Sequence, residues 1–297
     1  MDLSNGYVYD VECLPNLFTM SVTSVNTRQR RVYEISARKN ELLLIIALIE
    51  RMQKLGSVMI GFNNMGYDYP MLHHLLTHLS SYTDGEYICK RMYLKNQEII
   101  NTPFDNRFAH VIWDRDQLVP QIDLMKVHHF DNPAKATSLK VLEFNMQLED
   151  IRESPVKFGT VVKLHEIDDI IEYNDHDVFA TYRFYEKSAE ALQLRVELTK
   201  EFGKNFANHS DSKIGSDFFI MKLEERLGKQ ACFTKVDGVR KPRQTKRPKI
   251  RLKDVILPYV EFTTPEFIAV KSWMERQVIT TTKAVFTELE EDSLGLS

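Results

Sequence analysis

The chain has 297 residues, 43% of them hydrophobic, and a formal net charge of −3. This length and apolar content suffice for one large domain, or one domain with a smaller appendage, around a sizeable core. The charge excludes a protein whose whole surface binds polyanions, although local basic patches can still contact nucleic acid.

The cysteines and the apolar runs indicate the compartment. Cys13, Cys89 and Cys232 are odd in number, widely spaced and without a CxxC pair, which indicates a reducing compartment and no zinc site. The longest apolar run, residues 42–49, is too short to span a bilayer, and the N-terminus lacks a signal-peptide pattern. We therefore expect a cytoplasmic protein that has no membrane partner.

The N-terminal part predicts strands before helices. Three β-rich runs separated by turn residues predict strands over residues 7–13, 17–25 and 30–36. Residues 40–56 are rich in helix formers and end on glycine, which predicts a helix. The apolar run 57–62 predicts the next strand.

Helices and strands then alternate along the chain. We expect helices over residues 69–79, 138–146 and 167–202, the last of them one or two helices, and a strand over residues 110–113. Strands that come first and then alternate with helices are typical of an α/β fold with a mixed β-sheet flanked by helices.

The composition changes beyond about residue 208. Residues 212–228 predict a helix, and residues 236–254 predict an exposed basic connector with two prolines. Between Lys235 and Lys253 there are nine Lys or Arg residues and one Asp. Such a stretch can contact phosphate groups, and a solvated linker is an equally good interpretation.

Two acids lie in the first predicted strand. Because strand side chains alternate between faces, Asp10 and Glu12 project to the same side. Two carboxylates in a half-buried site repel each other and raise each other's pKa unless a cation lies between them. A hard divalent ion such as Mg²⁺ or Mn²⁺ resolves that conflict. The alternative is a strand whose acids face water.

Two further segments hold candidate acids. Asp68 opens a helix directly after a strand that ends at Phe62, and its alternative role is to cap that helix. Tyr173 and Asp177 stand four residues apart, so a helix would place them on one face. A phenol and a carboxylate could then reach one site. The alternative is an amphipathic helix with Tyr173 in the core and Asp177 exposed.

Together these segments resemble the three exonuclease motifs of the DnaQ-like 3′→5′ exonucleases. That family has Asp-x-Glu on its first strand, then Asn-x-x-aromatic-Asp, and a Tyr-x-x-x-Asp motif near its end. The matching residues are Asp10 and Glu12, residues 64–68 with Tyr67 as the aromatic residue, and Tyr173 with Asp177.

The third motif indicates which branch of the family the chain is similar to. The other branch has a histidine five residues before its last Asp, and this chain has Glu172 there. The resemblance is therefore to the tyrosine-type, or DEDDy, branch. It covers about residues 6 to 200 and implies a ribonuclease-H-like fold. We expect an exonuclease domain over residues 1–205 and a C-terminal α-rich appendage over residues 206–297.

A narrower resemblance is to the proofreading domains of bacteriophage-type DNA polymerases. Residues 121–156 resemble the segment between their second and third motifs, and Ser138, Leu139 and Lys140 begin a match to a motif that helps hold single-stranded DNA there. Residues 254–278 resemble the connector that leads into a polymerase module. A phage-encoded protein would act in the host cytoplasm.

The resemblance implies two divalent ions, Mg²⁺ or Mn²⁺, and a role for each motif residue. Asp10 would bridge both ions, Glu12 and Asp177 would bind the ion that holds the attacking water, and Asp68 would support the second. Tyr173 would orient that water rather than act as a strong base, since its ordinary pKa is about 10. The products would be nucleoside 5′-monophosphates released from a single-stranded DNA 3′ end.

Substrate contacts are expected beside the second motif. Phe62 and Tyr67 could stack on the terminal bases, with packing in the core as the alternative. Asn64 could donate a hydrogen bond to the terminal nucleotide, with a turn-forming role as the alternative.

Several functional alternatives stay open at the level of the sequence. We find no polymerase signature, so the chain is either a separately encoded proofreading subunit or the N-terminal part of a longer polymerase. The rival functions are an RNA exonuclease of the same branch and a non-catalytic module that binds single strands or a polymerase partner.

Overall fold

A computed structural model describes residues 2–106, 108–243 and 247–281. The chain divides into two compact units, Met1–Phe218 and Phe219–Ser297, which are described separately below. The domain boundary expected after residue 205 thus falls inside the first unit.

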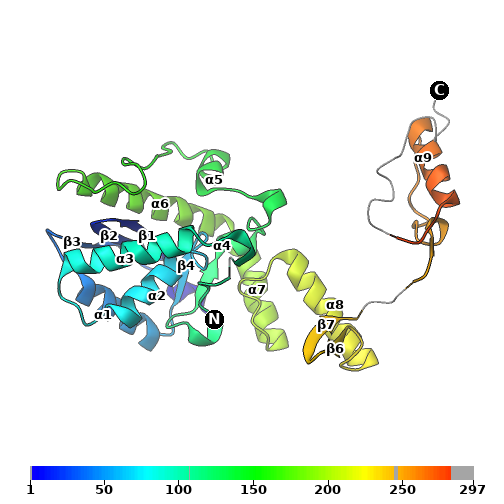
Figure 1. Ribbon diagram of the computed structural model, residues 1–297, viewed down its shortest axis with the longest axis horizontal. Coiled ribbons are helices and arrows are strands. Elements are labelled where there is room, and N and C mark those ends of the chain that lie inside the picture. Colours follow the sequence, from blue (N-terminus) through cyan, green and yellow to red (C-terminus); the bar gives the residue numbers. More distant parts are fainter. Residues whose placement is uncertain (1, 107, 244–246, 282–297) are drawn as a thin grey trace. The chain divides into compact units, whose positions relative to one another are not determined.

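The first unit is built on a five-stranded mixed sheet (Figure 1). Its strands are β1 (Gly6–Leu14), β2 (Leu17–Ser24), β3 (Arg30–Ser36), β4 (Val58–Gly61) and β5 (Gln121–Asp123), in the order β3-β2-β1-β4-β5. The central strand β1 pairs antiparallel with β2 and parallel with β4. The three predicted N-terminal strands and the predicted strand over residues 57–62 are confirmed.

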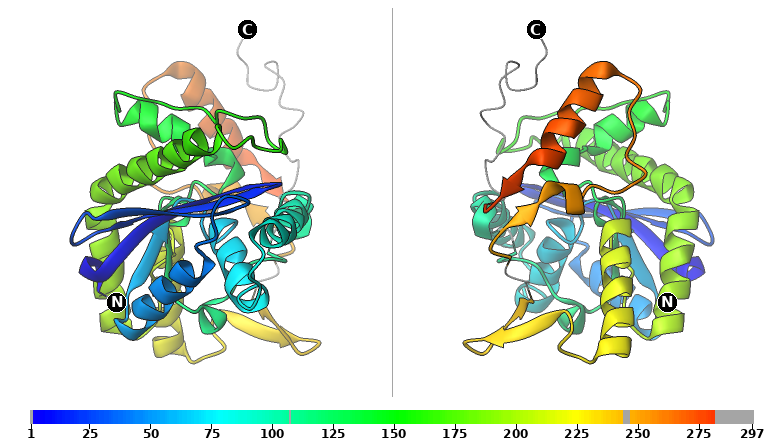
Figure 2. Two further views of the ribbon diagram at one scale, coloured as in Figure 1. Left: turned by 90° about the vertical axis from the view of Figure 1, so that its left-hand side faces the viewer. Right: turned by 90° about the vertical axis from the view of Figure 1, so that its right-hand side faces the viewer.

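Helices cover both faces of this sheet (Figure 2). Tyr9, Val11 and Cys13 of β1 are buried in one core cluster with residues of helices α1 (Leu42–Lys54), α2 (Asp68–His78) and α3 (Gly85–Ile100). On the other face, Val8 is buried in a second cluster with Val178 of α6 (Ile167–Lys187). Because side chains alternate along a strand, Asp10 and Glu12 lie on the α6 side. The α/β class, with helices flanking a mixed sheet, is confirmed.

The first unit contains further helical elements besides α1, α2, α3 and α6. These are 3₁₀ helices at Leu3–Asn5, Phe104–Asn106, Asp114–Asp116 and Pro133–Lys135, and helices α4 (Leu124–Val127), α5 (Leu139–Asn145), α7 (Ala189–Phe202) and the start of α8 (Asp211–Leu227). The predicted helix over 167–202 is two helices that meet at Ser188, and α7 ends at Gly203 in the left-handed conformation that glycine favours.

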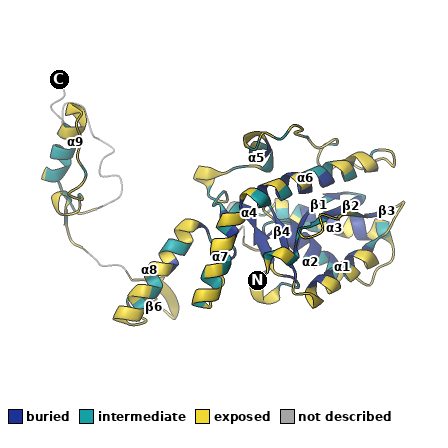
Figure 3. Ribbon diagram, turned by 180° about the vertical axis from the view of Figure 1, so that it is seen from behind, coloured by how far each residue is buried: buried dark blue, intermediate teal, exposed yellow. Residues whose placement is uncertain are grey.

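The predicted strand over residues 110–113 is wrong. Those residues are not in a strand, and His110 lies within hydrogen-bonding distance of Lys95 and Thr102. The strand that pairs with β4 is Gln121–Asp123, where Ile122 is 1% exposed. A four-residue apolar run is too short for periodicity to separate a strand from a loop. Figure 3 shows how buried the sheet strands are.

The second unit contains the end of α8, two small sheets and helix α9 (Pro265–Arg276). Strands β6 (Phe233–Val236) and β7 (Val239–Pro242) form a hairpin, a 3₁₀ helix spans Leu252–Asp254, and β8 (Ile250–Arg251) pairs with β9 (Val278–Ile279). The connector expected over residues 236–254 is therefore partly strand. Asp237 and Gly238, with φ of 52° and 77°, form the tight turn that an Asp-Gly pair favours.

No helix in the described ranges is both long enough and apolar enough to cross a membrane.

Candidate metal centre

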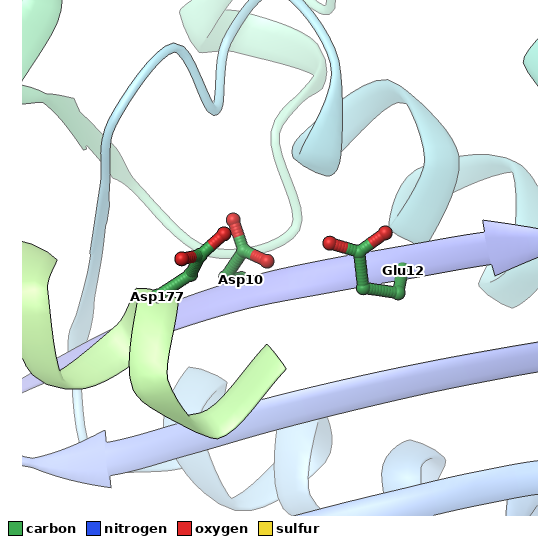
Figure 4. A group of neighbouring side chains, drawn as sticks. All are labelled: Asp10, Glu12 and Asp177. Carbon is green, nitrogen blue, oxygen red and sulfur yellow. The ribbon is translucent and has the colours of Figure 1, made fainter. Parts of the chain in front are cut away.

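Three acids from two distant segments meet at the middle of the sheet. Carboxylate oxygens of Asp10, Glu12 and Asp177 all lie within 4.8 Å of one another. Figure 4 shows Asp10 and Glu12 on β1 and Asp177 on α6. Asp177 is only 7% exposed, so the alternative in which it lies free in water is wrong. The spacing of these oxygens suits a shared cation.

A fourth acid, Asp68, lines a cleft beside this group and is held by a hydrogen bond to β1. It is the first residue of α2 and 4% exposed, and its Oδ1 accepts a hydrogen bond of 3.0 Å from the backbone N–H of Val11. The N-cap position belongs to Tyr67 and has no side-chain cap. Asp68 therefore ties the start of α2 to the strand that holds Asp10 and Glu12, instead of capping its own helix.

Burial of these acids raises their pKa values. The pKa of Glu12 is raised to about 8, by burial first and then by the negative charges of Asp177 and Asp68. Burial likewise raises the pKa of Asp68 to about 7, against the hydrogen bond from Val11. The pKa of Asp10 is well above its ordinary value because of burial and the charges of Asp68 and Glu12. Ionised together, these carboxylates require a cation.

Asn174 and Thr19 orient Asp10, and the sequence analysis did not identify either residue. The Nδ2 of Asn174 donates to Asp10 Oδ2 at 2.7 Å, and the hydroxyl of Thr19 donates to Asn174 Oδ1 at 3.1 Å. Thr19 lies opposite Glu12 in the β1–β2 register. The signal in the sequence for Asn174 is that it is a polar residue next to Tyr173 on the same helix. The contact between Thr19 and Asn174 depends on tertiary structure, so no local pattern indicates it.

Tyr173 lies one turn before Asp177 on α6 and is partly buried. Its pKa is raised, by burial first and then by the negative charge of Asp177, so the phenol keeps its proton at neutral pH. The Nζ of Lys140 lies 4.8 Å from the centre of the Tyr173 ring. A protonated phenol can donate a hydrogen bond but is a poor base.

Lys140 belongs to a chain of charges that joins α5 to α6. Its Nζ lies 2.8 Å from Asp177 Oδ1 and 3.3 Å from Glu143 Oε1. Glu143 is fully buried and its Oε2 lies 3.1 Å from His176 Nε2. Two residues of α5 thus contact two consecutive residues of α6, and we call this group the α5 clamp. The sequence analysis did not identify Glu143 or His176 as partners.

A cleft of about 720 Å³ opens beside the acids. Its lining includes four of the residues expected to bind substrate, Phe62, Tyr67, Ser138 and Leu139, together with Asp10, Glu12, Asp68 and Asp177. Lys140 and Tyr173 do not line it but lie next to Asp177. Most of the residues predicted from separate segments therefore surround one cavity.

Phe62 and Tyr67 pack against the core and also line the cleft, so the contact with bases stays a prediction. Phe62 packs edge-on against Phe184, with ring centres 6.2 Å apart, and also lines the cleft. Tyr67 lines the cleft while its hydroxyl donates to Asn96 Oδ1 at 2.9 Å. Each ring is therefore held in place by the core at the edge of the cavity.

Asn64 lies away from the cleft. It is fully buried, and its Nδ2 donates to Gln121 Oε1 at 3.0 Å, so its position does not support the expected contact with substrate. Its neighbour Asn63 lines the cleft instead. The buried Asp123 accepts hydrogen bonds from the backbone N–H groups of Asn63 and Met65 and so fixes this loop.

Comparisons with protein-family models, with curated proteins and with solved structures found no match. The donors of the site are carboxylate oxygens, which suit hard ions such as Mg²⁺ and Mn²⁺.

Proposed function

We propose that this chain is a metal-dependent 3′→5′ exonuclease of the DnaQ-like, DEDDy type that acts on single-stranded DNA ends. The observation that supports it most is the meeting of Asp10, Glu12 and Asp177, with oxygens within 4.8 Å, beside a cleft that Asp68 also lines. A ribonuclease-H-like fold belongs to the same proposal. It is supported by the mixed sheet whose central strand holds two of the acids.

The donor set fits the divalent ions that this activity requires. Asp10, Glu12, Asp68 and Asp177 would hold them. The negative charges of these carboxylates repel one another, and the raised pKa values of Asp10, Glu12 and Asp68 reflect burial and this repulsion, so a cation is favoured there. When bound, such ions activate a water molecule and neutralise the charge that develops on the phosphate and on the departing oxygen.

The reaction is a hydrolysis that releases one nucleotide at a time. The oxygen of water forms a bond to the terminal phosphorus, and the bond from phosphorus to the 3′-oxygen of the preceding nucleotide breaks. Water loses its proton, and the departing 3′-oxygen gains one. The products are a nucleoside 5′-monophosphate and a strand shortened by one residue.

Tyr173 and Lys140 have supporting roles in this proposal. The protonated phenol of Tyr173 orients the attacking water by hydrogen bonding, since burial raises its pKa and a protonated phenol is a poor base. Lys140 keeps a positive charge 2.8 Å from Asp177. Two carboxylates and the phosphate of a bound strand can share that charge, so Lys140 helps position Asp177 and the substrate.

The cleft accounts for the preference for unpaired ends. Phe62 and Tyr67 present ring surfaces that stack on bases of any sequence, and Leu139 adds an apolar contact. A frayed or mismatched end costs less to deliver to such a cleft than a paired one, which is the basis of proofreading. A polymerase module or subunit would then be the partner that supplies the strand.

The test uses single-stranded DNA with a label at its 3′ end. The folded protein should release labelled mononucleotides in the presence of Mg²⁺ or Mn²⁺ and none in EDTA. Asp10→Asn should reduce the rate by at least about a thousandfold, because the variant loses a ligand that no other residue replaces. The matched control is Asp169→Asn, which changes an exposed acid of α6 and should keep the wild-type rate.

Two outcomes would contradict the proposal. One is the absence of mononucleotide release from a protein shown to be folded, with tight binding of the strand, which would favour the non-catalytic module. The other is faster cleavage of RNA than of DNA of the same sequence, which would favour the RNA exonuclease.

A further inference from the structure

The second unit contains a strongly basic surface at the β6–β7 hairpin. Between residues 229 and 254 the described acids are Asp237 and Asp254, whereas the chain as a whole has a net charge of −3. The exposed cations there are Lys229, Lys235, Arg240, Lys241, Arg243, Arg247, Lys249, Arg251 and Lys253. The positive charge is thus concentrated in one short segment.

The strand register brings like charges together. Lys235 lies directly opposite Arg240 in the antiparallel pair. Like charges directly opposite each other destabilise a sheet, and a two-stranded hairpin has little stability to spare. The same register places Lys241, opposite Thr234, on the other face of the hairpin.

One of these cations is held in place by the unit itself. The guanidinium carbon of Arg240 lies 3.8 Å from the centre of the Phe233 ring, and its Nη2 donates to Glu224 Oε1 at 3.3 Å. The contact with Phe233 lies within the hairpin, and the contact with Glu224 ties the hairpin to α8. Within the described residues, no ion pair is found for Lys235, Lys241 or Arg243. Their charges are therefore available to an external anion.

We propose that the β6–β7 hairpin binds the phosphate backbone of single-stranded DNA, as a contact separate from the acidic cleft. A ribbon with closely spaced exposed cations is complementary to a regularly charged polyanion and needs no base-specific groups. The inference goes beyond the cleavage reaction, although the choice of DNA as the polyanion rests on the proposed function.

The experiment measures how strongly binding depends on salt. A fluorescein-labelled single strand of about 30 nucleotides is titrated with the full chain in EDTA, so that no cleavage occurs. The hairpin variant combines Lys241→Ala and Arg243→Ala, which lie two residues apart and so on one face of the hairpin. It leaves Arg240 in place because that residue holds the hairpin. The matched control removes two exposed lysines of the first unit, Lys54 and Lys90.

The expected result is a smaller salt dependence for the hairpin variant only. Each lost phosphate contact on a single strand lowers the slope of log affinity against log salt by about 0.7, so two contacts lower it by about 1.4. Affinity at low salt should fall by about tenfold or more. The control variant should keep the wild-type slope.

Equal slopes for the hairpin variant and the control would overturn the inference. The inference would also be overturned if the hairpin variant lost binding to vesicles of anionic phospholipid but kept the wild-type affinity for the oligonucleotide. That result would assign the surface to a membrane. Thermal melting of both variants verifies that they are folded. Binding is measured without metal and so does not depend on cleavage. If the wild-type protein does not cleave DNA but the hairpin variant still has a smaller salt slope than the wild type, only the exonuclease proposal is contradicted.

Discussion

Asp10, a metal ligand in the proposed function, is oriented by neighbours outside the group of acids. Asn174 donates to its carboxylate, and Thr19 in turn donates to Asn174. A group that orients a ligand affects metal binding because a rotated carboxylate binds poorly.

We predict that Asn174→Ala weakens Mn²⁺ binding and slows cleavage by about 10- to 100-fold. Isothermal titration with Mn²⁺ and the 3′-label assay measure the two effects. Asn174→Leu tests the same position with a side chain of similar size that cannot donate to Asp10, and it should weaken binding by a similar factor. Unchanged Mn²⁺ affinity in both variants would show that Asn174 does not position Asp10.

Tyr173→Phe removes one hydroxyl and keeps the ring beside Lys140. If the phenol only orients water, we expect kcat to fall by about ten- to a hundredfold, far less than for Asp10→Asn, with little change in KM. The pH–rate profile of the variant should keep its shape, because the phenol does not titrate near neutral pH. A profile that loses its basic limb would instead identify Tyr173 as the base.

The raised pKa values of the acids predict how stability depends on pH in EDTA. The pKa of Glu12 rises from 4.5 to about 8 in the folded protein, and that of Asp68 rises from 3.8 to about 7. Between the ordinary and the raised values, the folded protein binds more protons than the unfolded chain. The free energy of unfolding therefore falls as pH rises through this window. We expect the melting temperature in EDTA to be lower at the top of the window than at its start.

Glu12→Gln should make this decrease in melting temperature smaller. In the wild-type protein near pH 8, replacing EDTA by Mn²⁺ should raise the melting temperature again. The exposed-acid variant Asp169→Asn serves as the reference and should follow the wild type. A Glu12→Gln protein whose melting temperature depends on pH as steeply as the wild type would show that Glu12 does not titrate as expected.

At the scale of elements, α5 is a short helix whose position depends on charged contacts. The α5 clamp places the cleft residues Ser138 and Leu139, which lie at the start of that helix. Ser138 also caps the helix by accepting a hydrogen bond from the N–H of Val141 at 3.3 Å. Seven residues form a marginal helix without such support.

We predict that Glu143→Gln raises KM for the strand more than it lowers kcat. The amide can still accept a hydrogen bond from His176, but it no longer neutralises Lys140, so α5 is held less firmly against α6. Glu149→Gln, at an exposed site just beyond α5, is the control. Wild-type KM and kcat in the Glu143 variant would show that the clamp does not position the cleft.

The elements also show where local patterns were sufficient. The strands of residues 7–36 and the helices α1 and α2 could be predicted because their apolar residues repeat with the right period or form long runs. Neither helix α3 nor strand β5 was predicted, and the strand predicted over residues 110–113 is wrong. The three-residue strand β5 is defined by its pairing with β4, which no local pattern encodes.

At the scale of the whole molecule, the chain has two compact units, each held together by its own internal contacts. Helix α8 contains the boundary and ends at Leu227, before Gly228 at a φ of 94°. A fragment of residues 1–228 keeps this helix intact and contains every residue of the cleft.

We predict that the 1–228 fragment folds cooperatively and binds Mn²⁺ with wild-type affinity. It lacks the β6–β7 hairpin, so its binding to single strands should show the reduced salt dependence of the hairpin variant. Circular dichroism melting and Mn²⁺ titration provide the measurements. A fragment that does not fold would show that the second unit contributes to the stability of the first.

The sequence by itself determined which candidate residues could share one face of a strand or helix. Period-two spacing placed Asp10 and Glu12 on one face of a strand, and period-four spacing placed Tyr173 and Asp177 on one face of a helix, because these repeats follow from backbone geometry alone. Tertiary structure decided that Asn64 lies in the core, that Asn174 and Thr19 orient Asp10, and that Glu143 pairs with His176. Such contacts join segments more than a hundred residues apart in the case of Thr19 and Asn174. They depend on strand register and helix packing, which are set by the burial of the whole core.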